Sequence, residues 1–165
     1  MSATSESGVA IFGSAADLRA AVGTTIGSSE WLAIEQDRID TFADATGDHQ
    51  WIHVDPVRAA DGPFGAPIAH GYLTLSLVPV LAAQVYRVDN VTMSVNYGLN
   101  KVRFVTPVRV GSEIRDVVEL VEVVEVAGGL QLTWRHTIEI KDADRPACVA
   151  ESISRQYFPT ETSQS

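Results

Sequence analysis

The stretch FGAPIAHGYLTLSLVPVLAAQVY, residues 64–86, contains no charged side chain and decides the fold of this chain. It is about as long as a helix that crosses a bilayer, but Pro67, His70, Gly71 and Pro79 interrupt it. A helix that is apolar on every side is otherwise a buried element of a globular core. We therefore expect a long helix here, bent at Pro79, that a sheet rather than lipid surrounds.

The residues that follow this stretch change to the period of two that is typical of β-strands. Val91, Met93, Val95, Tyr97 and Leu99 alternate with polar residues and predict one half-buried strand. After Leu99 the apolar residues move from odd to even positions, at Val102 and Phe104, which predicts a bulge near residues 100–101. Further strands are predicted over residues 113–126, 130–140 and 148–158, with a hairpin turn at residues 128–129.

Helical signals precede the uncharged stretch. Ser14 is the predicted N-cap of a short helix that Gly23 ends. A second helix is predicted over residues 36–46, with Gly47 as its end. Asp55 is the predicted N-cap of a turn of helix that runs through Ala60. Residues 61–67 are a loop, and a weak strand is expected at 31–34. Helices followed by a run of strands indicate an α+β domain, whose sheet curls around the apolar helix. An open sheet edge favours a dimer.

The length and composition suit one acidic domain of 17.8 kDa. We expect flexible ends at residues 1–13 and 159–165 and a single domain over residues 14–158. The formal net charge of −9 disfavours nucleic-acid binding. Cys148 is the only cysteine, which excludes an intramolecular disulfide and a cysteine-cluster metal site. The start of the chain lacks the pattern of a secretory signal, so a cytoplasmic location is expected.

Candidate chemistry begins just after the helix over residues 36–46, where Asp48 and His53 stand five residues apart. They can form an acid–base pair acting on one water, because imidazole titrates near neutrality and a carboxylate orients water. The alternative is that Asp48 completes a turn and His53 lies on the surface. A zinc site built from Asp48, His49, His53 and His70 is a weaker option, since no recognised zinc spacing is present.

Three further groups have both a chemical and a structural interpretation. His70 and Gly71 open the uncharged helix, where free main-chain N–H groups can stabilise an oxyanion, or where glycine serves close packing on the sheet. Every charged residue between Asp89 and Glu113 is basic, namely Lys101, Arg103 and Arg109, which suits an anionic substrate or a solvated strand face. His136 lies on the apolar side of a strand and is interpreted as a packed core residue.

These motifs together resemble the MaoC-like (R)-specific enoyl-CoA hydratase/dehydratase family, in particular its single-domain mycobacterial type. The likeness covers about residues 30–157. The motif residues are Phe42-Ala43-x-x-Thr46-Gly47-Asp48, His53-x-Asp55-Pro56, Pro67-Ile68-Ala69-His70-Gly71, residues 97–104, and Pro107-Val108-x-x-Gly111.

The resemblance implies a hot-dog fold, a homodimer, and reversible hydration of a trans-2-enoyl-CoA to an (R)-3-hydroxyacyl-CoA in fatty-acid metabolism, with no metal or redox cofactor. Asp48 and His53 fall on the catalytic pair of the family, and Gly71 falls on the residue whose N–H receives the thioester carbonyl.

The other expected contacts belong to the substrate. His70 and Ser76 would lie beside it, the leucines at 73, 75 and 77 would line an acyl tunnel, and Lys101 and Arg103 would meet the CoA phosphates. Gln50-Trp51 replaces the usual Asn-Pro of the family, so we expect an altered pocket and chain-length preference. The alternatives are a hot-dog acyl-CoA thioesterase and a non-catalytic acyl-binding subunit of a hetero-oligomeric dehydratase.

Overall fold

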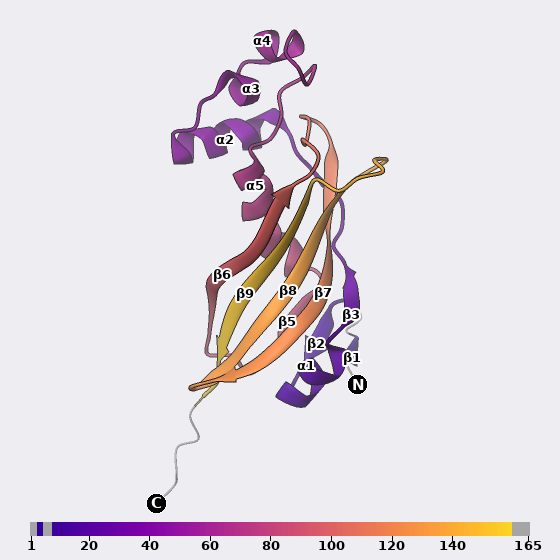
Figure 1. Ribbon diagram of the computed structural model, residues 1–165, viewed down its shortest axis with the longest axis vertical. Coiled ribbons are helices and arrows are strands. Elements are labelled where there is room, and N and C mark those ends of the chain that lie inside the picture. Colours follow the sequence, from indigo (N-terminus) through magenta and orange to yellow (C-terminus); the bar gives the residue numbers. More distant parts are fainter. Residues whose placement is uncertain (1–2, 5–7, 160–165) are drawn as a thin grey trace, which may run out of the picture.

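The computed structural model describes residues 3–4 and 8–159. One long sheet runs the length of the molecule and lies over α5 and α6, while α2, α3 and α4 gather at one end (Figure 1). The strands are β1 (Ala3–Thr4), β2 (Ala10–Phe12), β3 (Thr24–Ser28), β4 (Leu32–Ala33), β5 (Tyr86–Val88), β6 (Met93–Phe104), β7 (Glu113–Val126), β8 (Gly129–Ile140) and β9 (Cys148–Tyr157). The helices are α1 (Ala15–Ala21), α2 (Gln36–Thr46), α3 (Trp51–Val54), α4 (Pro56–Ala60), α5 (Gly71–Ser76) and α6 (Val78–Ala82).

The large sheet has the antiparallel order β3-β7-β8-β9-β6, and β4 also pairs with β7. A second, small sheet joins β1, β2 and β5, with β2 and β5 parallel. The α+β class and the sheet laid over an apolar helical segment are confirmed, and this is the hot-dog arrangement. The short strands β2, β3 and β5 lie outside the predicted set, because they are too brief to carry a periodic signal.

The uncharged stretch forms two short helices instead of one long bent helix. The break comes at Leu77, and Pro79 occupies the first turn of α6, where its missing N–H costs no hydrogen bond. Leu73, Leu77 and Leu81 are buried, but Tyr72 is 70 % exposed. The expectation of burial on every side is therefore wrong, because the sheet covers the helices from one side only. No helix among the described residues combines the length and the apolar character that crossing a membrane requires.

Side chains between the sheet and the helices form two core clusters. One surrounds Leu73 and Ile138 near α5, and the other surrounds Phe12 and Trp134 near α6 and β5. Trp134 stacks on Tyr86 with 3.9 Å between ring centroids and 19° between planes. Because Phe12 is fully buried in β2, the folded part begins before residue 14, and the flexible N-terminal end expected over residues 1–13 is too long. Residues 1–2, 5–7 and 160–165 lie outside the described residues.

Strand β6 differs from its predicted half-buried state. Its apolar residues Met93, Val95, Tyr97 and Leu99 are all exposed, and so are the residues of the opposite parity as far as Lys101. The reason is topological, since β6 is the last strand of the sheet and pairs only with β9 among the described strands. The predicted bulge is confirmed by a register shift between Leu99 and Val102.

The local signals before the site are confirmed. Helix α2 spans the predicted residues, buries Ile39 and Ala43, and ends at Gly47, whose φ of 80° is the left-handed conformation that glycine adopts readily. The side chains of Ser14 and Asp55 cap α1 and α4 as expected. Helix α2 and its glycine stop thus fix where the chain turns toward the segment that holds Asp48.

Candidate active site

His53 occupies the one-turn helix α3 rather than a loop, and its ring is buried. Its Nδ1–H donates a hydrogen bond of 2.6 Å to the Ile68 carbonyl, which can only accept. The neutral ring therefore keeps Nε2 as an acceptor. Burial lowers the pKa of His53 below 6.5, and the neighbouring His70 lowers it further. The hydrogen bond to the Ile68 carbonyl raises the pKa, but its effect is smaller than that of burial. His53 is thus held neutral near pH 7, which is the state of a general base.

His70 connects the two halves of the site. Its Nε2–H donates a bond of 2.9 Å to the main-chain carbonyl of Asp48, and its ring stacks on His53 with 3.8 Å between centroids. Phe42 of α2 also packs against His70, with 4.9 Å between the two ring centroids. His70 Nδ1 is buried and has no hydrogen-bond partner among the described residues. His70 therefore positions both Asp48 and His53.

The Asp48 carboxylate completes the site from the solvent side. Asp48 is exposed, and one oxygen accepts a long hydrogen bond of 3.4 Å from the Gln50 N–H. One ligand atom from each of Asp48, His53 and His70 lies within 4.8 Å of the others. The predicted pair is therefore brought together, and a single water between carboxylate and imidazole can bond to both groups.

The possible ligand atoms of these three residues are close enough together to be considered for a metal ion. A metal ion binds an imidazole nitrogen in the plane of the ring. The rings of His53 and His70 are stacked at 3.8 Å with only 23° between planes, so one ion cannot lie in both planes. The donor set therefore fits a hydrogen-bonded water better than zinc.

Gly71 is the first residue of α5, and its N–H has no hydrogen-bond partner among the described residues. A Cβ built on Gly71 would lie 2.8 Å from Cδ2 of Phe104. The glycine is thus required for close packing against β6 and also leaves an open main-chain donor. The two interpretations of this residue are compatible, because the packing involves its Cα and Phe104, whereas the donor is its main-chain N–H.

Comparison with known proteins agrees with this geometry. A family model for the MaoC like domain matches residues 17–139. The chain belongs to the MaoC-like dehydratase family. A 3-hydroxyacyl-thioester dehydratase Z from Mycobacterium tuberculosis is 55 % identical over 145 residues, which cover 87 % of this chain and 96 % of that protein.

Two solved structures share the fold of this MaoC-like domain. A monoamine oxidase regulatory protein from Archaeoglobus fulgius superposes with a TM-score of 0.71 at 26 % identity, covering 84 % of this chain and 92 % of that one. An (R)-hydratase from A. caviae gives 0.66 at 25 % identity, covering 83 % and 98 %. As a member of a dehydratase family with these relatives, the chain is a hydro-lyase.

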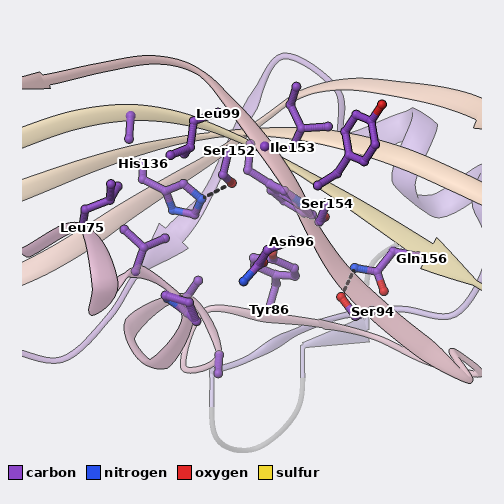
Figure 2. Close-up of a pocket in the computed structure, with 18 of the residues that line it drawn as sticks. Leu75, Tyr86, Ser94, Asn96, Leu99, His136, Ser152, Ile153, Ser154 and Gln156 are labelled. Atoms are coloured by element: carbon purple, nitrogen blue, oxygen red, sulfur yellow. Dashed lines mark hydrogen bonds between the residues drawn. The ribbon is translucent and has the colours of Figure 1, made fainter. Parts of the chain in front are cut away.

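A cavity of about 720 Å³ lies in this MaoC-like domain between the helices and the inner faces of β6, β8 and β9 (Figure 2). Leu75 and Ser76, which follow Gly71 by about one helical turn, form one wall, so the cavity starts near the site. Leu75 is the one member of the predicted leucine trio that lines it. Leu73 and Leu77 pack into the core instead, because they lie on the face of the helices turned to the sheet.

Other residues considered in the sequence take no part in the contacts that join Asp48, His53 and His70. His49 is exposed and bonds to Asp44 at 2.9 Å, which raises its pKa. Lys101 and Arg103 are exposed on β6 and form no ion pair within the described part of the chain. Trp51 packs against Arg58, with the guanidinium 4.4 Å from the ring centroid, so it is outside the lining of the cavity.

One buried group was not anticipated. His136 was interpreted as a packed core residue, and it is buried, but it is also part of a hydrogen-bonded chain. Its Nδ1 bonds to Asp116 Oδ2 at 2.7 Å, and its Nε2 bonds to Ser152 Oγ at 2.9 Å. A signal was present in the sequence, since Asp116 stands at inward parity in a strand whose other buried residues on that side are apolar.

Proposed function

We propose that this protein is an (R)-specific enoyl-CoA hydratase, which adds water reversibly across a trans-2-enoyl-CoA to give an (R)-3-hydroxyacyl-CoA. The supporting observation is the approach of Asp48 to neutral His53, next to a helix start whose Gly71 N–H has no hydrogen-bond partner among the described residues. The naming of relatives as a 3-hydroxyacyl-thioester dehydratase and an (R)-hydratase supports the same reaction.

The proposed mechanism uses one water and one transferred proton. Asp48 and His53 Nε2 accept hydrogen bonds from the water, whose oxygen attacks C3 while the C2–C3 π electrons move toward the thioester oxygen. The Gly71 N–H stabilises the resulting enolate oxygen, a contact whose loss typically costs about 3 kcal/mol. His53 takes the proton from the water, and the imidazolium returns it to C2 as the carbonyl re-forms. Because His53 is neutral at the start, it must accept a proton before it can donate one.

An assay of the unmodified protein tests the proposal. Crotonyl-CoA is supplied, and loss of the enoyl absorbance is followed together with chiral separation of the product. We expect conversion of crotonyl-CoA to the (R)-3-hydroxy thioester without release of free CoA. Release of CoA from a saturated acyl-CoA, with the enoyl absorbance unchanged, would indicate a thioesterase instead. Turnover that begins only when a second, different subunit is added would indicate the non-catalytic role.

The lowered pKa of His53 sets the expected pH dependence. The neutral ring is the active form, so kcat/KM should fall as pH drops through the pKa of His53, and that midpoint should lie below 6.5. Activity should be flat on going from about pH 7 to 8, because His53 is already neutral there. A pH–rate profile on crotonyl-CoA measures this, and an acid limb centred above pH 7 would contradict the assignment of His53 as the base.

Lys101 and Arg103 are proposed to contact the CoA phosphates, because both are exposed cations without an ion pair among the described residues. Replacing both by Gln should raise KM for enoyl-CoA about 3- to 10-fold and leave kcat unchanged, and added salt should shrink the difference. Arg19→Gln is the matched control, since Arg19 is paired with Glu125 on another part of the surface. Equal KM values for the double variant and the control would disprove the contact.

The partner of β6 is proposed to be a second copy of the chain. Strand β6 has twelve residues, lies at the end of the sheet, and exposes Val95, Tyr97 and Leu99. Long apolar edges of this kind are normally covered. Light scattering should therefore give twice the chain mass of 17.8 kDa, and Val95→Lys, which puts a charge on the proposed edge, should shift the protein toward the monomer. A monomeric unmodified protein would rule the homodimer out.

A further inference from the structure

The cavity beyond the catalytic pair is polar along one wall, and this wall is the feature pursued here. The inward residues of β9 past Ala150 are Ser152, Ser154 and Gln156, where the rest of the core carries apolar side chains. Opposite them on β6 are Ser94 and Asn96, and Gln156 Nε2 donates to Ser94 Oγ at 3.0 Å (Figure 2). A pocket that takes only an alkyl chain gains nothing from such a wall.

The Asp116–His136–Ser152 chain fixes one end of this wall. Asp116 and His136 are both almost fully buried, and their hydrogen bond holds the imidazole so that Nε2 meets Ser152 Oγ. The hydrogen bond therefore fixes the position of the serine oxygen at the cavity surface (Figure 2). The order of groups is that of a hydrolase triad, but the main chain around Ser152 is committed to the ladders with β8 and β6. No free N–H groups are therefore available to stabilise an oxyanion beside Ser152. The Asp116–His136–Ser152 series orients a hydroxyl and does not support an acyl-enzyme.

One polar group farther along the wall has no partner. The Asn96 side chain is exposed, lines the cavity, and its amide forms no hydrogen bond among the described residues. Trp134 Nε1 and Ser154 Oγ also lack a partner there, but both atoms are buried beneath the cavity surface. Water can pair with the Asn96 amide while the cavity is empty of ligand. An alkyl chain would displace that water and leave the amide unpaired, which is unfavourable.

A hydroxyl group on the ligand would satisfy the wall. It can accept from the Asn96 amide or bond to the Ser152 hydroxyl, which both line the cavity. We propose that the cavity selects acyl-CoA thioesters whose chain carries a hydroxyl group in its distal half. This rests on the proposed function, which places the thioester at Gly71. The part of the cavity lined by α5 begins about one helical turn beyond Gly71, and the polar wall from Ser152 to Gln156 spans roughly 13 Å along β9.

Binding of saturated acyl-CoA tests this without any turnover. Calorimetry compares dodecanoyl-CoA with its isomers hydroxylated at single positions of the distal half, using the full chain in its native oligomeric state. At least one isomer should bind about tenfold more tightly than dodecanoyl-CoA. Asn96→Leu or Ser152→Ala should remove most of that preference. Ser28→Ala, an exposed serine of β3 outside the cavity, is the matched control and should behave as the unmodified protein.

The outcomes separate this proposal from the proposed function. If every hydroxylated isomer binds no better than dodecanoyl-CoA, or if both cavity variants keep the full preference, the selection of hydroxylated chains is wrong even when crotonyl-CoA is hydrated. If the preference is found but no enoyl-CoA is hydrated, the cavity assignment stands and the proposed reaction does not. If no acyl-CoA binds, the cavity is not an acyl site and the proposal fails.

Discussion

Asp48→Asn and His53→Ala are each expected to lower kcat for hydration of crotonyl-CoA by about 10²- to 10⁴-fold. Asn keeps one acceptor oxygen but lacks the negative charge of the carboxylate, so it holds and polarises the water less strongly, and Ala leaves no acceptor at the position of Nε2. Both groups act on the same water, so the double variant should be little slower than the slower single variant. Spectrophotometric initial rates over a range of crotonyl-CoA concentrations measure the effect.

The chain supplies its own matched control for these substitutions. Asp44 and His49 repeat the same five-residue spacing, hydrogen-bond to each other at 2.9 Å, and are both exposed away from the cavity. Asp44→Asn and His49→Ala should therefore keep nearly full activity. Thermal unfolding of all four variants checks that loss of rate is not loss of fold. Full activity in Asp48→Asn or His53→Ala, or an equal loss in the control pair, would overturn the catalytic assignment.

Gly71→Ala is expected to have the second large effect, on both stability and rate. The new Cβ would lie 2.8 to 3.0 Å from three ring atoms of Phe104, so either the ring or α5 must move. Overpacking of this kind costs about 1–3 kcal/mol of unfolding free energy. A displaced α5 also moves the main-chain donor, so kcat should fall at least about tenfold. Chemical denaturation and steady-state kinetics measure the two effects separately.

Phe104→Leu in the same chain distinguishes the two roles of Gly71. The smaller side chain makes room for the Cβ, so the double variant should recover most of the stability lost by Gly71→Ala. If the rate recovers too, the glycine acts only through packing. If the rate stays low, the Cβ itself hinders approach of the thioester carbonyl to the N–H. A Gly71→Ala variant with unchanged stability and rate would contradict both roles.

Local signals in the sequence were sufficient where a single residue type determines the backbone. Gly47 in the left-handed conformation ends α2 at the predicted residue, and the caps at Ser14 and Asp55 begin α1 and α4 as predicted. The five-residue spacing of Asp48 and His53 predicted a shared water, and their ligand atoms do approach within 4.8 Å. These features depend on short-range geometry, which sequence patterns record directly.

Features that depend on distant partners were predicted poorly. The alternation in β6 was interpreted as half-buried, but the sheet ends there, and no local pattern reveals that an apolar strand is the last one. His136 was interpreted as a core residue because its partners Asp116 and Ser152 lie 20 and 16 residues away. The role of His70 was placed at the substrate, yet the bond from its Nε2 goes to the Asp48 carbonyl across 22 residues.

The three tryptophans of the chain lie in different surroundings, and this gives the protein a built-in optical signal. Trp31 lies beneath Arg115 and Trp51 beneath Arg58, so both indoles are at the surface next to a guanidinium. Trp134 alone is fully buried, stacked on Tyr86 in the cavity wall. Its fluorescence is therefore shielded from aqueous quenchers that reach the other two, and the blue edge of the emission reports when an acyl chain enters, with no label attached.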